Sequence, residues 1–347
     1  MSEKVKIAIV GASFAGLRAY ISLKKRFPKA IFYLFDKEDY FTFIPSLHLS
    51  LCRPSHLQKS QFSLKRYFGE AFIHEEVISI KDHLIETKKK TYAFDYAVIS
   101  TGAKVNYFGN DDLKKHALGA KSVPHLKVLH KRLPAAKKIV IIGGGLSGVE
   151  YAAMLGATSD KEVTLINGAD RLLPAILPKA GAYANRYLEK KGVKVIHDAK
   201  AVSATEKKVV LDSGEEIPAD MIMMCTGLKQ FCPLLDSSPI TDTLHLEDDD
   251  HIFLCGDVAK SDKVPTAHAA MIEGDIVAEH ICAKLHQREP KPRLMKRQTT
   301  LAVGLGPQAG FIVFRSWYLP LPFTGFLKLH IEKSILLSFK RRIKLFI

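Results

Sequence analysis

Residues 138–159 read KIVIIGGGLSGVEYAAMLGATS: a short apolar run, a glycine turn, and a stretch with apolar residues three and four positions apart. This order predicts a buried strand, a tight loop and a helix. Residues 5–28, VKIAIVGASFAGLRAYISLKKRFP, repeat the pattern, and each copy is followed by another apolar run, at 31–36 and at 162–167. Two strand–helix–strand units in one chain predict an α/β fold with two similar domains.

Both glycine turns have the pattern of a loop that holds a pyrophosphate. Glycine permits the tight turn and the close approach of the backbone, and the following helix directs its amide hydrogens at the phosphates. One such loop is weak evidence, but two loops with the correct strand and helix are specific. We therefore expect two Rossmann-like domains that each bind a dinucleotide. The loop residues are Gly143, Gly145 and Gly148 in the second copy and Gly11, Ser13 and Gly16 in the first.

The end of the second strand of each unit is the place for a residue that reads the adenosine ribose. In the first unit this is Asp36, whose carboxylate can accept hydrogen bonds from both ribose hydroxyls. In the second unit Asn167 takes the place, with Arg171 four residues later. Asparagine does not repel a 2′-phosphate and Arg171 can attract one, although a plain surface charge is an equal alternative. The choice between NADH and NADPH therefore stays open.

An ordered set of motifs resembles the FAD-dependent pyridine nucleotide–disulfide oxidoreductase superfamily over residues 5 to about 285. Besides the two loops and Asp36, the set consists of Thr101-Gly102, Glu150, Thr226-Gly227 and Gly256-Asp257. The section YFTFIP, which ends at Pro45, is similar to type II NADH dehydrogenases and sulfide:quinone oxidoreductases. The later sections LAVGLGPQAG and KSILLSFKRR are similar to apoptosis-inducing-factor-like NAD(P)H:quinone reductases.

The resemblance implies a role for each region. FAD is expected on the first loop, with Asp257 on its ribityl chain and a helix N-terminus near Ala267 pointing at the flavin. NADH or NADPH is expected on the second loop, with Glu150 near the nicotinamide. The implied domains are 1–105 with 236–290 for FAD, 106–235 for NAD(P)H, and 291–347 as a basic, aromatic region for a membrane or an interface.

The chain departs from the superfamily in two places. Disulfide reductases have a close cysteine pair after the first ribose-binding strand, whereas Lys37–Arg53 contains only Cys52, so dithiol relay chemistry is not expected. Type II NADH dehydrogenases have a glutamine motif, AQxAxQQG, where residues 267–274 read AHAAMIEG. His268 and Glu273 remain as groups to bind or protonate a quinone oxygen. A capped or solvated His268 is an equal alternative.

Composition narrows the remaining classes. Five cysteines, an odd number without a CxxC pair, argue against a disulfide framework and a zinc site, so no metal is expected. Ten of the fifteen net positive charges fall after residue 287, among aromatic residues. This pattern favours an anionic membrane surface over nucleic acid. The residues expected to embed are Trp317, Tyr318, Phe323, Phe326, Leu327, Leu336, Leu337 and Phe346; those expected to face lipid are Lys333, Lys340, Arg341, Arg342 and Lys344.

The function that we predict is an FAD-dependent NAD(P)H:quinone oxidoreductase, peripheral on the inner, cytoplasmic face of a membrane. The first strand begins near Met1, which leaves no room for a signal peptide ahead of it. The open alternatives are a sulfide:quinone oxidoreductase, a ferredoxin-type reductase, and a flavoprotein that mainly binds nucleic acid or a partner. A homodimer interface is the alternative use of the C-terminal region.

Overall fold

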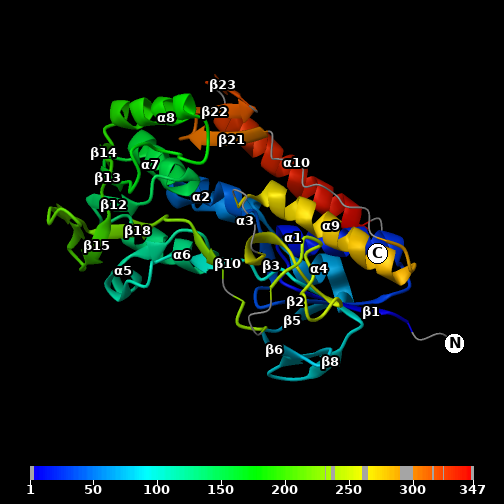
Figure 1. The fold of residues 1–347 in the computed structure, drawn as a ribbon. Helices are drawn as coiled ribbons and strands as arrows, with labels where there is room; N and C mark the ends of the chain where they lie inside the picture. The colour runs from blue at the N-terminus through cyan, green and yellow to red at the C-terminus, as the bar shows by residue number, and fades with distance from the viewer. Residues whose placement is uncertain are drawn as a thin grey trace.

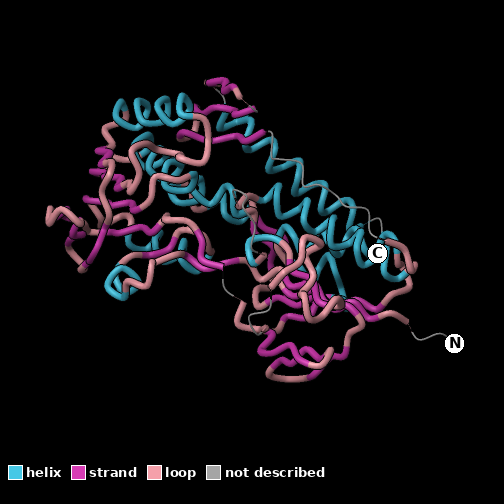
Figure 2. The backbone as a smooth tube through the Cα atoms, in the orientation of Figure 1, coloured by secondary structure: helices cyan, strands magenta, loops and turns pink. Residues whose placement is uncertain are grey.

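The computed structural model describes residues 4–230, 232–235, 239–259, 265–289, 300–314, 316–322 and 324–344. Two α/β lobes lie side by side, and the last helix runs along both (Figure 1). Helices flank the strands in each lobe (Figure 2). The predicted α/β class with two Rossmann-like parallel sheets is confirmed.

The first sheet is parallel throughout and has the order β20-β9-β1-β2-β5. Its apolar sequences are buried on both faces, as in sheets covered by helices on each side. Strand β20 comes from residues far along the chain and pairs with β9. The strands are β1 (Lys6–Val10), β2 (Ile31–Asp36), β5 (Phe72–His74), β9 (Tyr96–Ile99) and β20 (Ile252–Leu254).

The second sheet repeats this arrangement in the order β11-β18-β12-β13-β14. The predicted apolar run at 162–167 forms its fourth strand, one residue shorter than expected. The strands are β11 (Leu118–Gly119), β12 (Lys138–Ile142), β13 (Glu162–Ile166), β14 (Lys194–Ile196) and β18 (Met221–Met224).

Helices cover these sheets and join them. The helix after each glycine loop packs on its own sheet, and the helix expected to begin near Ala267 forms as α9, against α1. The helices are α1 (Phe14–Arg26), α2 (Leu47–Cys52), α3 (Ser55–Lys59), α4 (Leu64–Phe68), α5 (Asp111–His116), α6 (Val123–Arg132), α7 (Leu146–Thr158), α8 (Pro178–Lys190), α9 (Ala267–Leu285) and α10 (Thr324–Lys344).

Short antiparallel pairings and single helical turns complete the lobes. The pairs and meanders are β3 (Tyr40–Thr42) with β4 (Gln61–Ser63), β6 (Val77–Lys81) with β7 (Leu84–Thr87) and β8 (Thr91–Ala93), β10 (Ala103–Val105) with β19 (Leu228–Gln230), and β15 (Ala201–Ala204) with β16 (Lys208–Leu211) and β17 (Glu216–Pro218). The 3₁₀ turns are η1 (Ile44–Ser46), η2 (Gly69–Ala71) and η3 (Gly256–Val258).

The C-terminal region packs on both lobes. A meander of β21 (Thr300–Leu305), β22 (Ala309–Phe314) and β23 (Trp317–Pro320) leads into α10, which contacts β21, β22, η1 and α4. Figure 1 shows α10 running from this meander toward the first lobe. Its buried stripe is Lys328, Glu332, Leu336 and Phe339, spaced as on one side of a helix.

This packing corrects part of the expected membrane-embedding set. Leu336 is only 5% exposed and belongs to the core of the first lobe, so its assignment to a lipid-facing surface is wrong. Tyr318 is half-buried against Tyr183 and Phe311. Phe323 and Phe346, and the side chains of Phe326, Arg342 and Lys344, lie outside the described residues. The expected domain boundaries stay predictions, and those at 236 and 290 fall outside the same residues.

The contact between α1 and α9 depends on Gly274. A Cβ atom there would lie 2.4 Å from the Ala15 carbonyl oxygen and 3.1 Å from the Ala19 amide nitrogen. We expect Gly274→Ala to destabilise the protein by about 1–3 kcal/mol, because backbone cannot yield as a flexible side chain can. Urea unfolding measures the change. Gly168→Ala, where the nearest atom is 3.7 Å away, is the control, and equal losses in both would contradict the packing described.

Candidate active site

One large cavity, about 950 Å³ in volume, joins the two lobes. Both glycine loops, η1, the N-terminus of α9 and the C-terminal region contribute to its wall. Twelve of the predicted site residues line it: Gly11, Ser13, Asp36, Pro45, Thr101, Gly102, Gly145, Glu150, Gly227, Gly256, Asp257 and His268. The other seven lie outside its lining: Gly16, Gly143, Gly148, Asn167, Arg171, Thr226 and Glu273.

The two glycine loops have the same backbone geometry. Gly11 and Gly143 have φ of +101° and +113°, and a Cβ atom on either would lie within 2.6 Å of a carbonyl oxygen on the neighbouring strand. A Cβ atom on Gly16 or Gly148 would lie 2.0 or 1.8 Å from the carbonyl oxygen of the first glycine of its loop. The two loops therefore hold their helices equally close, which leaves each helix N-terminus open to a pyrophosphate.

Asp36 connects the first loop to its ribose position. Its Oδ2 accepts a hydrogen bond from the Ala12 amide at 2.7 Å, and its Oδ1 accepts one from the Glu38 amide at 2.9 Å. Burial raises the pKa of Asp36, and these amides counteract the rise. Each carboxylate oxygen retains a second lone-pair position, which can accept a ribose hydroxyl.

Asp257 and Lys121 both line the cavity, close enough for each charge to affect the pKa of the other. Burial raises the pKa of Asp257, and the Lys121 ammonium opposes this effect. Burial lowers the pKa of Lys121, whereas the Asp257 carboxylate raises it. Two opposite charges thus face a shared, partly dry space, and each favours the charged form of the other.

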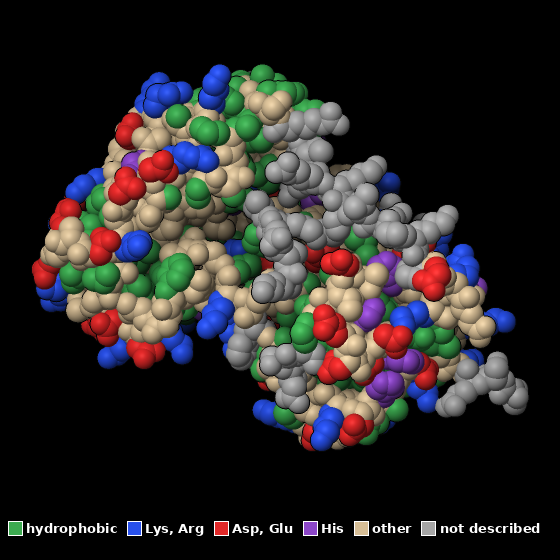
Figure 3. Space-filling view, in the orientation of Figure 1, with side chains coloured by type: hydrophobic (Ala, Val, Ile, Leu, Met, Phe, Trp, Pro, Cys, Tyr) green, Lys and Arg blue, Asp and Glu red, His purple; other side chains and the backbone are tan. Residues whose placement is uncertain are grey.

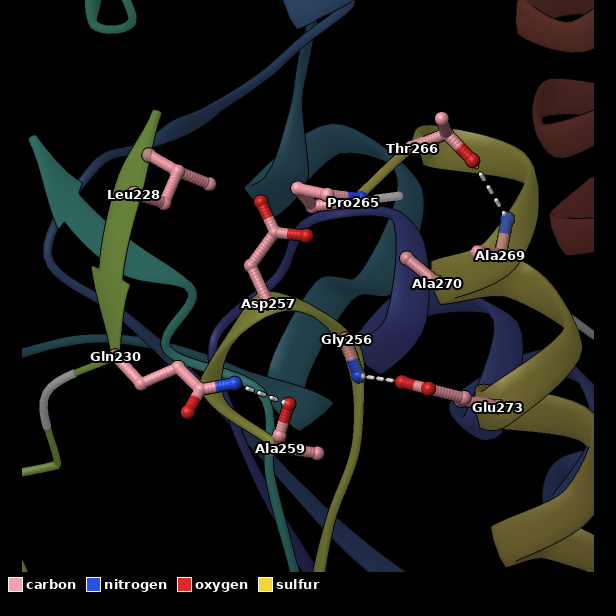
Figure 4. Close-up of a pocket in the computed structure, with 10 residues that line it drawn as sticks. All are labelled: Leu228, Gln230, Gly256, Asp257, Ala259, Pro265, Thr266, Ala269, Ala270 and Glu273. Atoms are coloured by element: carbon pink, nitrogen blue, oxygen red, sulfur yellow. Dashed lines mark hydrogen bonds between the residues drawn. The ribbon is translucent and has the colours of Figure 1, made fainter. Parts of the chain in front are cut away.

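A smaller cavity of about 220 Å³ lies beside Asp257 (Figure 4). Glu273, which is 2% exposed, points at the turn beneath it, where its Oε2 accepts a hydrogen bond from the Gly256 amide at 2.6 Å. The side-chain amide of Gln230 donates to the Ala259 carbonyl on the other side of the same turn. Glu273 therefore holds η3 in position from below.

The N-terminus of α9 faces the large cavity. Thr266 caps the helix by accepting a hydrogen bond from the Ala269 amide at 3.2 Å, and Ala267, His268 and Met271 line the cavity. His268 is exposed. The positive end of the helix dipole favours negative charge at this place, and the imidazole has access to solvent protons.

Glu150 lies in the wall beside the second loop and is paired with the C-terminal helix. It forms a buried ion pair with Lys328, and its Oε1 accepts a hydrogen bond from the Gly304 amide at 3.1 Å. His48 Nδ1 lies 3.6 Å from its Oε2. Burial acts to raise the pKa of Glu150, but Lys328 and the other donors outweigh it, so the net pKa is lowered. Burial lowers the pKa of His48 to about 3, so Lys328 is the cation of this group.

Three of the predicted site residues that lie outside the cavity lining donate side-chain hydrogen bonds to backbone carbonyls. The Thr226 hydroxyl donates to the Asn106 carbonyl at 2.6 Å, which holds the connection between the lobes. The Asn167 amide donates to the Ala169 and Arg171 carbonyls at 2.8 and 3.0 Å. The Arg171 guanidinium donates to three backbone carbonyls of the next turn.

Sequence reasoning missed His48, Lys121 and Lys328, which all line the cavity. No loop motif marks them. Lys328 and Glu332 are charged residues on the buried stripe of α10. Their interruption of the apolar helical spacing is the sequence signal that could have identified them.

Thiol and metal chemistry are the remaining possibilities to consider among the described residues. All five cysteines are unpaired, and burial raises the thiol pKa of Cys225 to about 12. Among the described side chains, no group of three His, Cys, Asp or Glu is arranged to hold a metal ion.

No helix in the described ranges is both long and apolar enough to span a bilayer.

Comparison with known proteins decides the family. The family described as pyridine nucleotide-disulphide oxidoreductase matches residues 5–274, well over half of the chain and both glycine loops. The chain belongs to this family. The predicted superfamily is thus confirmed, and the chain is an FAD-dependent oxidoreductase that uses NAD(P)H.

The individual relatives share low sequence identity with this chain, but the alignments cover most of both proteins. Ferroptosis suppressor protein 1 of Xenopus tropicalis is 26% identical over 310 residues, which cover 81% of each chain. The solved structures of NDH2 from Plasmodium falciparum in complex with NADH and of the sulfide:quinone oxidoreductase from Aquifex aeolicus have TM-scores of 0.86 and 0.84. They share 14% and 16% identity; the alignments cover 99% and 97% of this chain and 97% and 92% of those chains.

The buried pair makes a prediction for stability. Lys328→Met leaves the Glu150 carboxylate buried without its cation, so we expect a loss of about 3–5 kcal/mol at neutral pH. Because its folded pKa is lowered, Glu150 stabilises the wild type above its ordinary value near 4.5 and loses this effect as pH falls through the folded pKa. In the variant, burial is opposed only by the Gly304 amide and His48, so Glu150 becomes protonated more readily and the difference from wild type shrinks in acid.

Urea unfolding between neutral and acidic pH measures this difference. Lys333→Met, on the exposed face of the same helix, is the control and should change stability little. Glu150→Gln combined with Lys328→Met should recover most of the loss. A loss in Lys328→Met that does not depend on pH would show that packing, and not the charge, is responsible.

Proposed function

We propose that this protein is an FAD-dependent NAD(P)H:quinone oxidoreductase that works at a membrane surface. The observation that carries the proposal is one continuous cavity, which contacts both glycine loops and also has an apolar wall from the C-terminal region. That wall consists of Leu301, Ala302, Ile312, Ile331 and Ile335. Two cofactors and an apolar acceptor can therefore meet in one continuous space.

The residues present fit FAD on the first loop and NAD(P)H on the second. Each loop has a glycine whose Cβ would fill the space of the close backbone contact, and only the first has a carboxylate for a ribose. Bound FAD supplies hydride acceptance from NAD(P)H and electron release to the acceptor. The α9 N-terminus and Lys121 place positive potential around the position that we assign to the flavin.

The acceptor follows from the apolar wall and from the thiols. A quinone has an apolar ring and tail with two polar oxygens, which suits a wall of aliphatic side chains near a few polar groups. Sulfide oxidation needs thiolates, whereas burial raises the pKa of the Cys225 and Cys232 thiols and so disfavours that form. We therefore favour a quinone reduced by NAD(P)H over sulfide as the electron donor.

The two candidate residues of α9 for proton supply have different roles. His268 lines the cavity and is exposed, so it can pass solvent protons to a reduced quinone oxygen. Glu273 lies outside the large cavity and accepts a hydrogen bond from the Gly256 amide, so we assign it to positioning of the Asp257 turn.

Glu150 is kept ionised by Lys328 and lies at the second loop, where it can orient the nicotinamide.

An exposed apolar strip on the C-terminal region suits a lipid surface. Trp317, Leu319, Leu327, Ile331 and Leu337 are 36–52% exposed, and Ile331 also lines the cavity. Because Ile331 belongs to both the strip and the cavity wall, we infer that a lipid-soluble acceptor enters at this edge of the strip.

The distribution of charge over the molecule supports nucleic-acid binding less well than membrane binding. Lys333 and Arg341 are exposed on α10, close to the apolar strip. On the face drawn in Figure 3, basic and acidic side chains alternate over both described lobes. A surface for phosphate backbones instead gathers cations along one face.

Anaerobic reduction tests the activity. We expect NADH or NADPH to bleach the FAD of the purified protein, and a short-chain quinone then to restore its colour. Sulfide should leave the flavin oxidised. Bleaching by sulfide, or recovery only with a ferredoxin, would contradict the proposed donor or acceptor.

Flotation with vesicles tests the membrane surface. We expect the triple variant Lys333→Glu, Leu337→Glu, Arg341→Glu to bind anionic vesicles at least about tenfold less than wild type, because each basic residue contributes roughly 1 kcal/mol near such a surface. The control is Ile78→Glu on β6, which has a similar exposure of 46% but lies on the first lobe. Equal binding by the triple variant and the control would exclude this face as the lipid contact.

A further inference from the structure

The turn Leu173–Ile176 forms part of the cavity wall over the second glycine loop. All four of its residues line the cavity. The Leu173 amide donates to the Gly144 carbonyl at 2.8 Å, which fastens the turn to the loop expected to hold the nicotinamide cofactor. The turn is thus part of the same wall as Gly145 and Glu150.

The backbone of this turn is held in a costly shape. Leu173 has φ of +54°, a left-handed conformation that a branched apolar residue rarely adopts, and its side chain is only 2% exposed. Such conformations cost about 1–3 kcal/mol and persist only where the surroundings enforce them. They cluster at ligand-binding sites for this reason.

Arg171 enforces the shape. Its Nη1 donates to the Leu173 and Ile176 carbonyls at 3.3 and 3.2 Å, and its Nη2 donates to the Pro174 carbonyl at 2.7 Å. The carbonyls of the turn therefore point inward at one guanidinium. No carboxylate among the described residues forms an ion pair with Arg171, so these dipoles are its main partners.

Asn167 holds the start of the same segment. Its Nδ2 donates to the Ala169 and Arg171 carbonyls, and His197 Nδ1 lies 3.2 Å from the same nitrogen. The two residues expected to read the ribose or a 2′-phosphate are therefore both engaged with the backbone that leads into the turn. Three of the five N–H donors of the guanidinium are thus used by the carbonyls of the turn.

We propose that Arg171 is a positioning residue, which clamps the Leu173–Ile176 turn against the second glycine loop and so shapes the nicotinamide-nucleotide site without selecting between NADH and NADPH. This inference rests on the proposed use of NAD(P)H. It does not depend on the identity of the acceptor. Affinity for both nucleotides is then set by the turn, and the preference between them is not set by the charge of Arg171.

Calorimetric titration of the FAD-loaded full chain with NAD⁺ and with NADP⁺ separates the two roles. For Arg171→Ala we expect Kd to rise about tenfold for both nucleotides, with their ratio unchanged, because a displaced wall affects groups that both share. Arg171→Lys should lose nearly as much, since one ammonium does not span three carbonyls although it retains the charge. Arg186→Ala, an exposed arginine of α8, is the control.

Ala175→Glu tests the turn without touching its clamp, in case Arg171→Ala does not fold. Ala175 is exposed and lines the cavity, so a carboxylate there should weaken both nucleotides. A loss confined to NADP⁺ in Arg171→Ala would overturn the proposal and make Arg171 a phosphate reader. Unchanged affinity in both Arg171→Ala and Ala175→Glu would remove the turn from the site. Retained nucleotide binding without any quinone reduction would overturn only the acceptor.

Discussion

The structure depends on two places where a helix meets its own loop without a side chain between them. A methyl group added at Gly16 or at Gly148 would overlap the carbonyl oxygen of the first glycine of the same loop. Both helices start close to their strands, and the first residues of both line the cavity. The cavity, the pairing of Asp36 with Ala12 and the position of Glu150 all follow from these two contacts.

The C-terminal region completes the site by burying charge. Lys328 reaches from α10 to Glu150 at the second loop, and His56 on α3 lies 3.3 Å from Glu332 one turn further along α10. The buried Lys328–Glu150 ion pair gives little net stability but is strongly destabilising when broken, so it specifies one docking position. The apolar wall and the nucleotide loops are thereby held in a fixed relation.

The local repeats were predictable and the long-range contacts were not. The strand–loop–helix units, Asp36 and the helix from Ala267 follow from apolar spacing and glycine positions. Lys121 and His48 have no pattern in sequence, because they enter the cavity from separate segments. Arg171 was visible but its partners were not, since backbone carbonyls leave no trace in a sequence. Leu336 was misassigned because one helix has both a core face and an outer face.

The strand order also bears on how the chain is made. The first sheet receives β20 only after the whole second sheet has been synthesised, and α9, which covers α1, comes later still. A ribosome adds roughly 5–20 residues per second, so the N-terminal strands wait on the order of ten seconds for their last partner. During that interval the strand edge at β9 and the apolar side of α1 are open to chaperones or to other nascent chains, whereas all five strands of the second sheet have already been made.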